Sequence, residues 1–156
     1  MKLFLDTNIL LDYLLERENF SFTRNLFLLA ITKQLTLFAS TAQANDLLYV
    51  LGGRSKNGIS ENYKQALIKM TSFINFVPLS SQNFKDALTM NWKDAEDACV
   101  YEVAKSVGAD VIISRDEKGF ANSSIPVMSA KTWLEGTKAQ KKAMRKSKSS
   151  MPLENY

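Results

Sequence analysis

Apolar residues form two kinds of pattern along this chain, and the two kinds alternate. Short continuous apolar runs that end at polar or turn-forming residues favour buried strands. The predicted strands are residues 2–5, 35–40, 73–77, 110–114 and 126–128. Apolar positions three and four residues apart favour amphipathic helices instead. The predicted helices are residues 8–16, 21–32, 41–51, 60–71, 81–90, 94–107 and a last one from about 131.

Strands that alternate with helices predict an α/β fold, in which helices cover both faces of a parallel sheet. In such a sheet the functional site lies beyond the carboxyl ends of the strands. Two predicted strands end at an acid, because residues 2–5 lead into Asp6 and residues 110–114 lead through Arg115 into Asp116. If both strands are central and parallel, these two carboxylates meet at one edge of the sheet.

Asp97 belongs to the sixth predicted helix, where its position relative to the apolar residues is informative. Val100 and Val103 mark the apolar stripe of this helix, and Asp97 stands three residues before Val100. This acid therefore projects from the buried side, where it needs a partner such as a cation. Asp94 has a competing role as a helix N-cap, since Asp94 and Asp97 have the spacing of a capping box. We therefore rank Asp97 above Asp94.

Other polar residues near these acids have less definite roles. Asp6 on its own is also explained as a helix N-cap, which Asp, Thr or Asn can form. Asp46 lies on a helix that is apolar almost all round, and Asp12 is expected to be a surface charge. Ser114 and Asp116 are two residues apart on an extended segment, so their side chains point the same way.

The amino-acid composition excludes several mechanisms. The chain has no histidine and a single cysteine, Cys99. These counts exclude a Ser-His-Asp triad, a Cys-His pair, acid–base cleavage by two histidines, and zinc sites that need histidine or several thiolates. Cys99 has no partner for an intrachain disulfide, which fits a reducing compartment. If the chain is an enzyme, its carboxylates carry the chemistry.

Several carboxylates at one edge of a sheet repel one another. Two unit charges about 4 Å apart repel by roughly 4 kcal/mol at an effective dielectric constant near 20. Three or four such groups are tolerable if divalent cations bind them or if some of them are protonated. Oxygen ligands favour Mg²⁺ or Mn²⁺ over softer metals. Such a metal can activate water and neutralise a phosphate, so hydrolysis of phosphodiester bonds is the natural reaction class.

Three segments also carry a family resemblance. They are Leu5-Asp-Thr-Asn-Ile-Leu-Leu-Asp12, Asp94-Ala-Glu-Asp-Ala98 and Ile113-Ser-Arg-Asp-Glu-Lys-Gly-Phe120. In this order and spacing the chain resembles the PIN domain family, and within it the VapC-type toxin ribonucleases of bacterial and archaeal toxin–antitoxin pairs. The following Ile125-Pro-Val127 is similar to the closing strand of that family. The resemblance extends over residues 1–136.

The resemblance implies a role for each matching position. Asp6, Asp97 and Asp116 match the metal-binding acids of the family. Ser114 matches the hydroxyl next to the last acid, and Asn8 matches the polar residue that supports the first.

Two further positions complete the candidate site. Asp46 matches the second acid of the family, which is usually a glutamate. Because aspartate is one methylene shorter, either its helix lies closer, a water bridges the gap, or Asp46 is not a ligand. Asp94 is added to the candidate metal ligands Asp6, Asp97 and Asp116.

The resemblance also implies a PIN-like α/β/α sandwich with a central parallel sheet of about five strands between helices. It implies an endoribonuclease that cleaves single-stranded RNA with Mg²⁺ or Mn²⁺, a homodimer, and an antitoxin that blocks the site. The alternative is a PIN-like module that has lost catalysis and acts as an RNA-binding or scaffold subunit, which the departure at Asp46 favours. A phosphatase of the haloacid dehalogenase type would need an acid in place of Asn8, and a phospho-receiver domain would need a lysine after a late strand.

The net charge of +4 belongs to the C-terminal end of the chain. Residues 138–156 contain six lysines and arginines against one acid, so that residues 1–137 are almost neutral. We expect one nuclease domain over residues 1–136 and a basic helix end or tail over 137–156. This tail either contacts a phosphate backbone or is a solvated helix end. The chain has no apolar run of about 18 residues and no secretory signal pattern, so we expect a cytoplasmic protein.

Overall fold

Five parallel strands form one sheet in the computed structural model, which describes residues 1–53 and 55–149. The strands are β1 (Lys2–Leu5), β2 (Thr36–Ser40), β3 (Ile74–Val77), β4 (Val111–Ile113) and β5 (Val127–Met128). Their order in the sheet is β3-β2-β1-β4-β5, and every neighbouring pair is parallel. β1 therefore lies at the centre with β4 directly beside it, which confirms the arrangement expected from the strand ends.

Seven helices connect and cover these strands in the described part of the chain. They are α1 (Thr7–Leu14), α2 (Phe20–Ile31), α3 (Thr41–Gly52), α4 (Glu61–Met70), α5 (Ser81–Thr89), α6 (Ala95–Ser106) and α7 (Ala130–Ser149). Every predicted strand and helix is confirmed, and no end is displaced by more than two residues. The predicted α/β/α architecture is confirmed as well.

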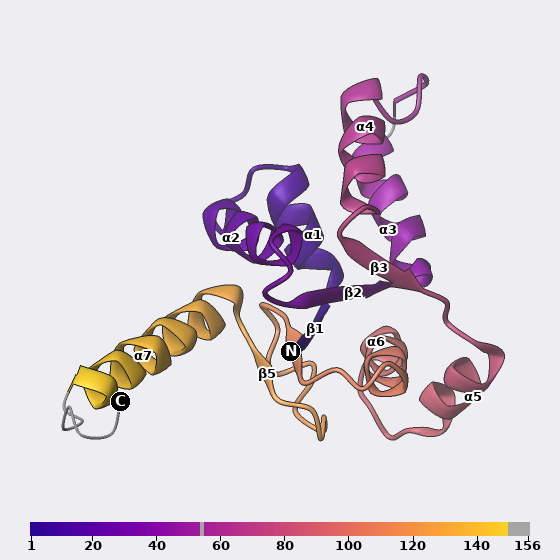
Figure 1. Ribbon diagram of the computed structural model, residues 1–156. Coiled ribbons are helices and arrows are strands. Elements are labelled where there is room, and N and C mark those ends of the chain that lie inside the picture. Colours follow the sequence, from indigo (N-terminus) through magenta and orange to yellow (C-terminus); the bar gives the residue numbers. More distant parts are fainter. Residues whose placement is uncertain (54, 150–156) are drawn as a thin grey trace.

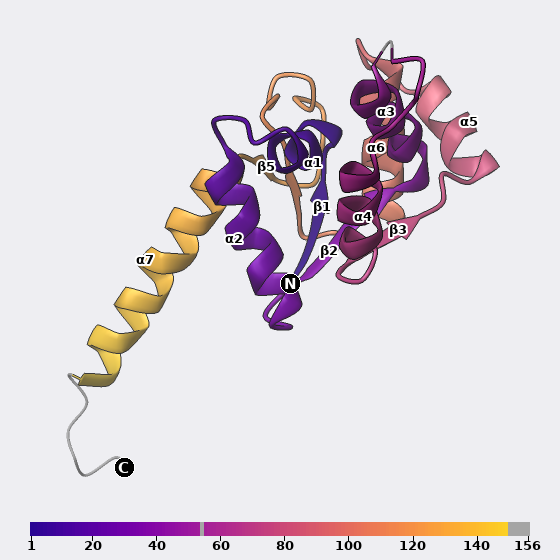
Figure 2. The same cartoon turned by 90° about the horizontal axis from the view of Figure 1, so that it is seen from above.

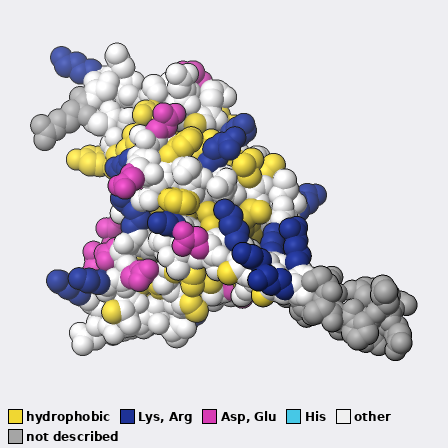
Figure 3. All heavy atoms as spheres, turned by 90° about the vertical axis from the view of Figure 1, so that its left-hand side faces the viewer, with side chains coloured by type: hydrophobic (Ala, Val, Ile, Leu, Met, Phe, Trp, Pro, Cys, Tyr) yellow, Lys and Arg dark blue, Asp and Glu magenta, His cyan; other side chains and the backbone are white. Residues whose placement is uncertain are grey.

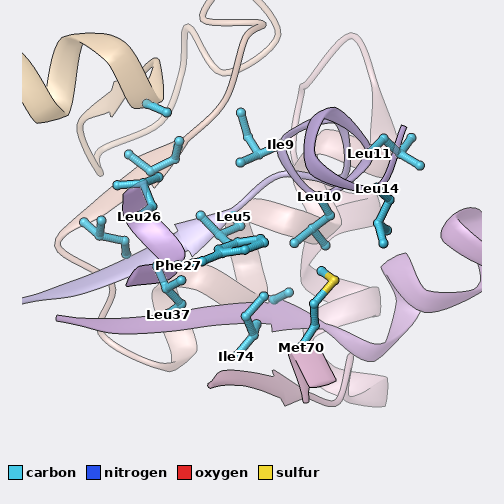
Figure 4. Packing of buried hydrophobic residues seen from close by; sticks show 14 of the residues in the cluster. Leu5, Ile9, Leu10, Leu11, Leu14, Leu26, Phe27, Leu37, Met70 and Ile74 are labelled. Carbon is cyan, nitrogen blue, oxygen red and sulfur yellow. The ribbon is translucent and has the colours of Figure 1, made fainter. Parts of the chain in front are cut away.

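Alternating side chains of the strands build a separate hydrophobic core on each face of the sheet. Leu3 and Leu5 point into the larger core, together with apolar residues of α1, α2, α3 and α4. Phe4 points the opposite way, into a smaller core against α6. Figures 1 and 2 show α1 to α4 on one side of the sheet, with α5 and α6 on the other. Figure 4 shows the larger core, where Phe27 lies between β1 and β2 residues such as Leu5 and Leu37.

The start of α3 is tied to the end of β1. Ser40 caps α3, and Gln43 completes a capping box by accepting a hydrogen bond from the Ser40 backbone N–H at 2.6 Å. The amide of Gln43 also donates to the carbonyl of Leu5 at 2.9 Å and to the hydroxyl of Thr7 at 3.2 Å. Because Gln43 is buried, these bonds fix α3 against the edge where β1 ends.

The last helix, α7, begins in the core and then leaves the body of the protein. Ala130 and Leu134 are buried against the larger core, and α7 contacts α2. Figures 1 and 2 show the rest of α7 extending away from the sheet. The helix is continuous across the boundary predicted at residue 136, and residues 150–156 of the predicted tail lie outside the described residues. None of the described helices is both long and apolar enough to cross a membrane.

Candidate active site

Asp6, Ser114 and Asp116 are joined by hydrogen bonds at the carboxyl edge of the sheet. The hydroxyl of Ser114 donates to Asp6 Oδ2 at 2.8 Å and accepts from the backbone N–H of Asp116 at 3.0 Å. Ser114 is fully buried and Asp6 is 8% exposed. Burial raises the pKa of Asp6, while the hydrogen bonds from Ser114 and from the Thr7 backbone N–H act in the opposite direction.

The pairing of β1 with β4 produces this arrangement. The backbone N–H of Asp6 donates to the carbonyl of Ile113 at 3.0 Å, which continues the ladder by one residue beyond β1. Asp6 is also the N-cap of α1, with Oδ1 accepting from the Thr7 N–H at 2.8 Å. The two interpretations of Asp6 are therefore compatible, since one oxygen caps the helix and the other faces Ser114.

Asp97 comes to the same edge from the first turn of α6. Burial raises the pKa of Asp97 from 3.8 to about 6, and the negative charges of Asp6, Asp94 and Asp116 add to the rise. Asp97 therefore lies within electrostatic range of both strand-end acids, as its place on the apolar side of the helix indicated. It is half-buried rather than enclosed.

Gly119 allows Asp97 and Asp116 to approach each other. A Cβ atom on residue 119 would lie 2.5 Å from Asp97 Oδ2 and 2.7 Å from Asp116 Oδ2, which is closer than real Cβ contacts. The backbone N–H of Gly119 also donates to Asp116 Oδ1 at 3.0 Å. Gly119 was not among the residues predicted for the site; its signal in the sequence was its place in the segment that follows Asp116.

Asp94 and Asp46 have different surroundings. Asp94 caps α6 by accepting from the Glu96 backbone N–H at 2.8 Å, and it also lines the cleft that contains Asp97 and Asp116. Asp46 is exposed and lies beside the Glu96 side chain, where burial and Asp46 raise the pKa of Glu96. Within residues 1–53 and 55–149, the acid on which Asp46 acts is Glu96, which in turn interacts with Asp94 and Asp6; Glu96 was not among the predicted site residues.

Asn8 is not brought to Asp6 in the structure. Its side chain is exposed in the first turn of α1, and no hydrogen bond between it and Asp6 is found among the described residues. The hydrogen bonds to the Asp6 side chain come from the Ser114 hydroxyl and the Thr7 N–H, and the role that the resemblance implied for Asn8 stays a prediction.

The expectation that Asp12 is a surface charge is wrong. Asp12 is 0% exposed, and Arg115 and Arg17 lie 3.5 Å and 4.0 Å from its two carboxylate oxygens. Burial raises the pKa of Asp12, and the two arginines oppose that rise. The signal that was available is the apolar residues on both sides of Asp12, because a helix that is apolar almost all round is a buried helix.

The carboxylate oxygens at this edge are suitable ligands for a divalent cation, but they do not yet form a complete set of ligands. Asp97 and Asp116 each direct one carboxylate oxygen toward the space beside Gly119, and carboxylate oxygens are the ligands of Mg²⁺ and Mn²⁺. Across residues 1–53 and 55–149, however, no three acids already form a metal cage. Asp6 and Asp94 are the candidate third ligands; Asp6 Oδ2 already accepts a hydrogen bond from Ser114, and Asp94 Oδ1 accepts one from the Glu96 N–H.

The fold and this edge define an α/β protein whose candidate site consists of carboxylates at the ends of two central strands and at the start of one helix. The chain belongs to the PIN domain family, whose family model matches residues 2–118.

Three relatives extend this comparison. Ribonuclease VapC1 of Aquifex aeolicus (strain VF5) is 24% identical over 140 residues, which are 86% of this chain and 94% of that protein. The crystal structure of VapBC2 from Rickettsia felis bound to a DNA fragment from their promoter has a TM-score of 0.61 at 20% identity, with 83% of this chain and 98% of that chain covered. The sarcin–ricin loop cleaving toxin VapC20 of Mycobacterium tuberculosis has a TM-score of 0.59 at 14% identity, with 77% and 94% covered. At these identities the two structures show the likeness of the fold.

Proposed function

We propose that this chain is a metal-dependent endoribonuclease that hydrolyses phosphodiester bonds of single-stranded RNA, and that it is the toxin of a toxin–antitoxin pair. The observation that carries the proposal is the approach of Asp97 and Asp116 beside Gly119, next to the hydrogen-bonded Asp6 and Ser114. Burial raises the pKa of Asp97, and the negative charges of Asp6, Asp94 and Asp116 add to the rise. The names of VapC1 and VapC20 as RNA-cleaving proteins support the choice of RNA.

Each residue has a distinct part in this proposal. Asp97 and Asp116 hold Mg²⁺ or Mn²⁺, and Asp6 and Asp94 are the candidate further ligands. The bound ion supplies charge neutralisation at the phosphate and lowers the pKa of water. Ser114 fixes the orientation of Asp6 and, through the Asp116 N–H, the backbone that carries Asp116.

The test is cleavage of a single-stranded RNA by purified protein with and without Mg²⁺ or Mn²⁺. We expect cleavage only with metal, and loss of cleavage in Asp6→Asn. Asp86→Asn is the matched control, because it makes the same change on α5 away from the acidic edge. Equal cleavage by wild type and Asp6→Asn would refute the assignment and indicate a contaminating nuclease.

The same comparison tests the alternative of an inactive RNA-binding or scaffold module. The exposure of Asp46 and the incomplete metal cage favour that alternative. If neither Mg²⁺ nor Mn²⁺ supports cleavage, and wild type and Asp6→Asn bind RNA equally well, the chain is an RNA-binding or scaffold module and not an enzyme.

The proposal includes two partners, a cognate antitoxin and a second copy of the chain. Exposed apolar side chains support both, because surfaces of this kind mark protein contacts. A groove of about 220 Å³ between α2 and α4 includes the exposed Leu28 and Ile31, and α3 and α4 expose Leu48, Tyr49 and Ile68. Figure 3 shows hydrophobic side chains open to the surface between lysines and arginines on one side of the molecule.

These partners have separate tests. A homodimer predicts twice the chain mass in light scattering, and Tyr49→Asp together with Ile68→Asp should shift that mass to a monomer if α3 and α4 form the contact. An antitoxin predicts a small open reading frame directly beside the gene, whose product abolishes RNA cleavage when it is added. A monomer mass in the wild type would refute the homodimer. A neighbouring gene product that does not affect RNA cleavage would refute the antitoxin.

A further inference from the structure

A cleft of about 490 Å³ opens beside the acidic edge, and its lining is chemically divided. Asp94, Asp97 and Asp116 lie along it with Gly119. The rest of its lining is Trp92, Lys93, Lys118, Ala121 and Asn122. The acids account for a cation and a reacting phosphate, but they give no reason for an indole and two lysines in the same cleft.

Trp92 is held in place by two other aromatic rings. The rings of Trp92 and Tyr101 have centroids 5.0 Å apart and planes inclined at 30°, and the ring of Phe120 meets Trp92 edge-on at 5.9 Å. Tyr101 and Phe120 are themselves buried, and the Tyr101 hydroxyl is hydrogen-bonded to Ser124 at 2.8 Å. Tyr101 backs one side of the indole, so the part of Trp92 that remains open lines the cleft. Its orientation is therefore fixed before any ligand arrives.

Lys93 and Lys118 add positive charge to the same cleft. Both side chains are exposed, and within residues 1–137 neither forms an ion pair with the nearby acids. An aromatic surface next to unpaired cations matches the chemistry of a nucleic-acid strand, which presents a flat base and a phosphate at each repeat. Stacking on a side chain requires a base whose faces are free, and bases inside a duplex are stacked on their neighbours.

We propose that Trp92 is a stacking platform for one unpaired base of the RNA strand beside the bond that is cleaved, and that Lys93 and Lys118 contact the adjacent phosphates. This inference rests on the proposed function for the identity of the strand. It adds a binding subsite to the acidic edge and assigns the preference for single-stranded RNA to a particular side chain.

The fluorescence of Trp92 provides a direct test. The chain has two tryptophans, and Trp133 is a half-buried residue of α7 in the larger core. Trp133→Phe therefore leaves Trp92 as the single reporter, and adding Asp6→Asn prevents hydrolysis during the measurement. The probes are a six-nucleotide RNA of mixed sequence, the same strand with abasic positions, and the same sequence as a duplex, each with Mg²⁺.

We expect saturable quenching by the single strand and little quenching by the abasic strand or the duplex. The abasic strand keeps every phosphate, so it separates stacking from charge without changing the protein. Stacking on one aromatic side chain corresponds to about 5- to 150-fold in affinity. In the otherwise wild-type chain, Trp92→Ala should weaken RNA binding by a factor in this range, and Trp92→Phe should restore part of it. The melting temperature of each variant checks its folding.

The outcomes distinguish this inference from the proposed function. If wild type cleaves RNA but abasic and intact strands quench equally, or Trp92→Ala binds RNA like wild type, the stacking platform is refuted and the nuclease remains. If the intact strand quenches selectively and no metal supports cleavage, the subsite stands and the nuclease assignment fails. Weaker RNA binding in Lys93→Gln and Lys118→Gln, with quenching at saturation still selective for the intact single strand, would assign the lysines to phosphate contacts as proposed.

Discussion

The buried Asp12 and the acids at the carboxyl edge of the sheet both lie next to the segment of residues 114–116. The two regions differ in the charges that surround their carboxylates. Asp12 is fully buried in α1, and the protein itself supplies two arginines beside it. At the carboxyl edge, Asp6, Asp97 and Asp116 approach one another, and no ion pair to them is found within residues 1–137. Burial raises the pKa in both regions, but arginines oppose the rise at Asp12 whereas other acids increase it at Asp97.

We take this difference to separate a carboxylate with a structural role from the carboxylates of the proposed metal site. The charge of the buried Asp12 is compensated within the fold by Arg115 and Arg17. Among the described residues, neither oxygen of Asp12 accepts a hydrogen bond within the geometric limits. Acids without an ion pair among the described residues leave a site for an external cation, although Arg115 opposes the raised pKa of Asp6. Arg115 connects the two regions, because its backbone lies between Ser114 and Asp116 while its side chain reaches Asp12.

The largest effect is expected from Gly119→Ala. The added methyl group would meet Asp97 Oδ2 at 2.5 Å and Asp116 Oδ2 at 2.7 Å, so both carboxylate oxygens must move. Displacements of about 1 Å at a catalytic centre cost on the order of 100-fold in rate, and we expect a loss of RNA cleavage of that size. Gly136→Ala is the matched control, since a Cβ there meets nothing within 4 Å. Unchanged cleavage by Gly119→Ala would show that the approach of Asp97 and Asp116 does not matter for activity.

A loss of stability is expected from Arg115→Ala. This change leaves the buried Asp12 with Arg17 alone, at 4.0 Å. Leaving a buried charged acceptor without its partner costs about 1–3 kcal/mol. The loss of stability should not exceed this range, because the Arg115 side chain is itself 40% exposed. The free energy of unfolding in urea measures it, with Lys118→Ala as the control on the same loop. A double change with Asp12→Asn should recover part of the loss, and no recovery would mean that the ion pair is not its cause.

A gain of stability, rather than a loss, is expected from Asp97→Asn when no metal is present. The folded-state pKa of Asp97 is about 6, above its ordinary 3.8, so folding favours the protonated acid and stability falls as the pH rises through this interval. At pH 7 the variant should therefore be more stable than wild type, by about 1 kcal/mol for a half-buried group. The advantage should disappear by pH 4. Thermal melts from pH 4 to pH 7 with a chelator measure it.

Metal provides the complementary measurement for Asp97. Millimolar Mn²⁺ should raise the melting temperature of wild type at pH 7, because an ion that binds the folded state stabilises it. The shift should be smaller in Asp97→Asn. A melting temperature that does not respond to Mn²⁺ in wild type would favour the scaffold alternative.

The sequence allowed the strand-end acids to be predicted because their placement depends on local pattern. Apolar runs that end at Asp6 and Asp116 locate both acids once the sheet is parallel, and helical periodicity locates Asp97. These inferences need only the direction of each strand and the phase of one helix.

The remaining features depend on residues that are far apart in the chain. Asp12 is paired with an arginine near the other end of the domain, and Gln43 bonds the carbonyl of Leu5 across two elements. Gly119 acquires its role only when α6 lies against the loop after β4. No period in the sequence encodes such contacts, because they follow from how the elements pack.

The smallest expected effect concerns α7, which carries positive charge away from the acidic edge. From Lys138 onward the described side chains of this helix are exposed, and Figure 2 shows the helix extending away from the body. If these lysines bind RNA, removal of residues 138–156 should flatten the salt dependence of RNA binding by about 0.7 in slope for each single-strand phosphate that the helix no longer neutralises. A full-length control with Lys138, Lys141, Lys142 and Arg145 changed to glutamine should flatten the slope in the same direction but by less, since it removes four of the six positive charges without shortening the helix. Identical slopes for wild type and both variants would mean that the basic helix is a solvated end.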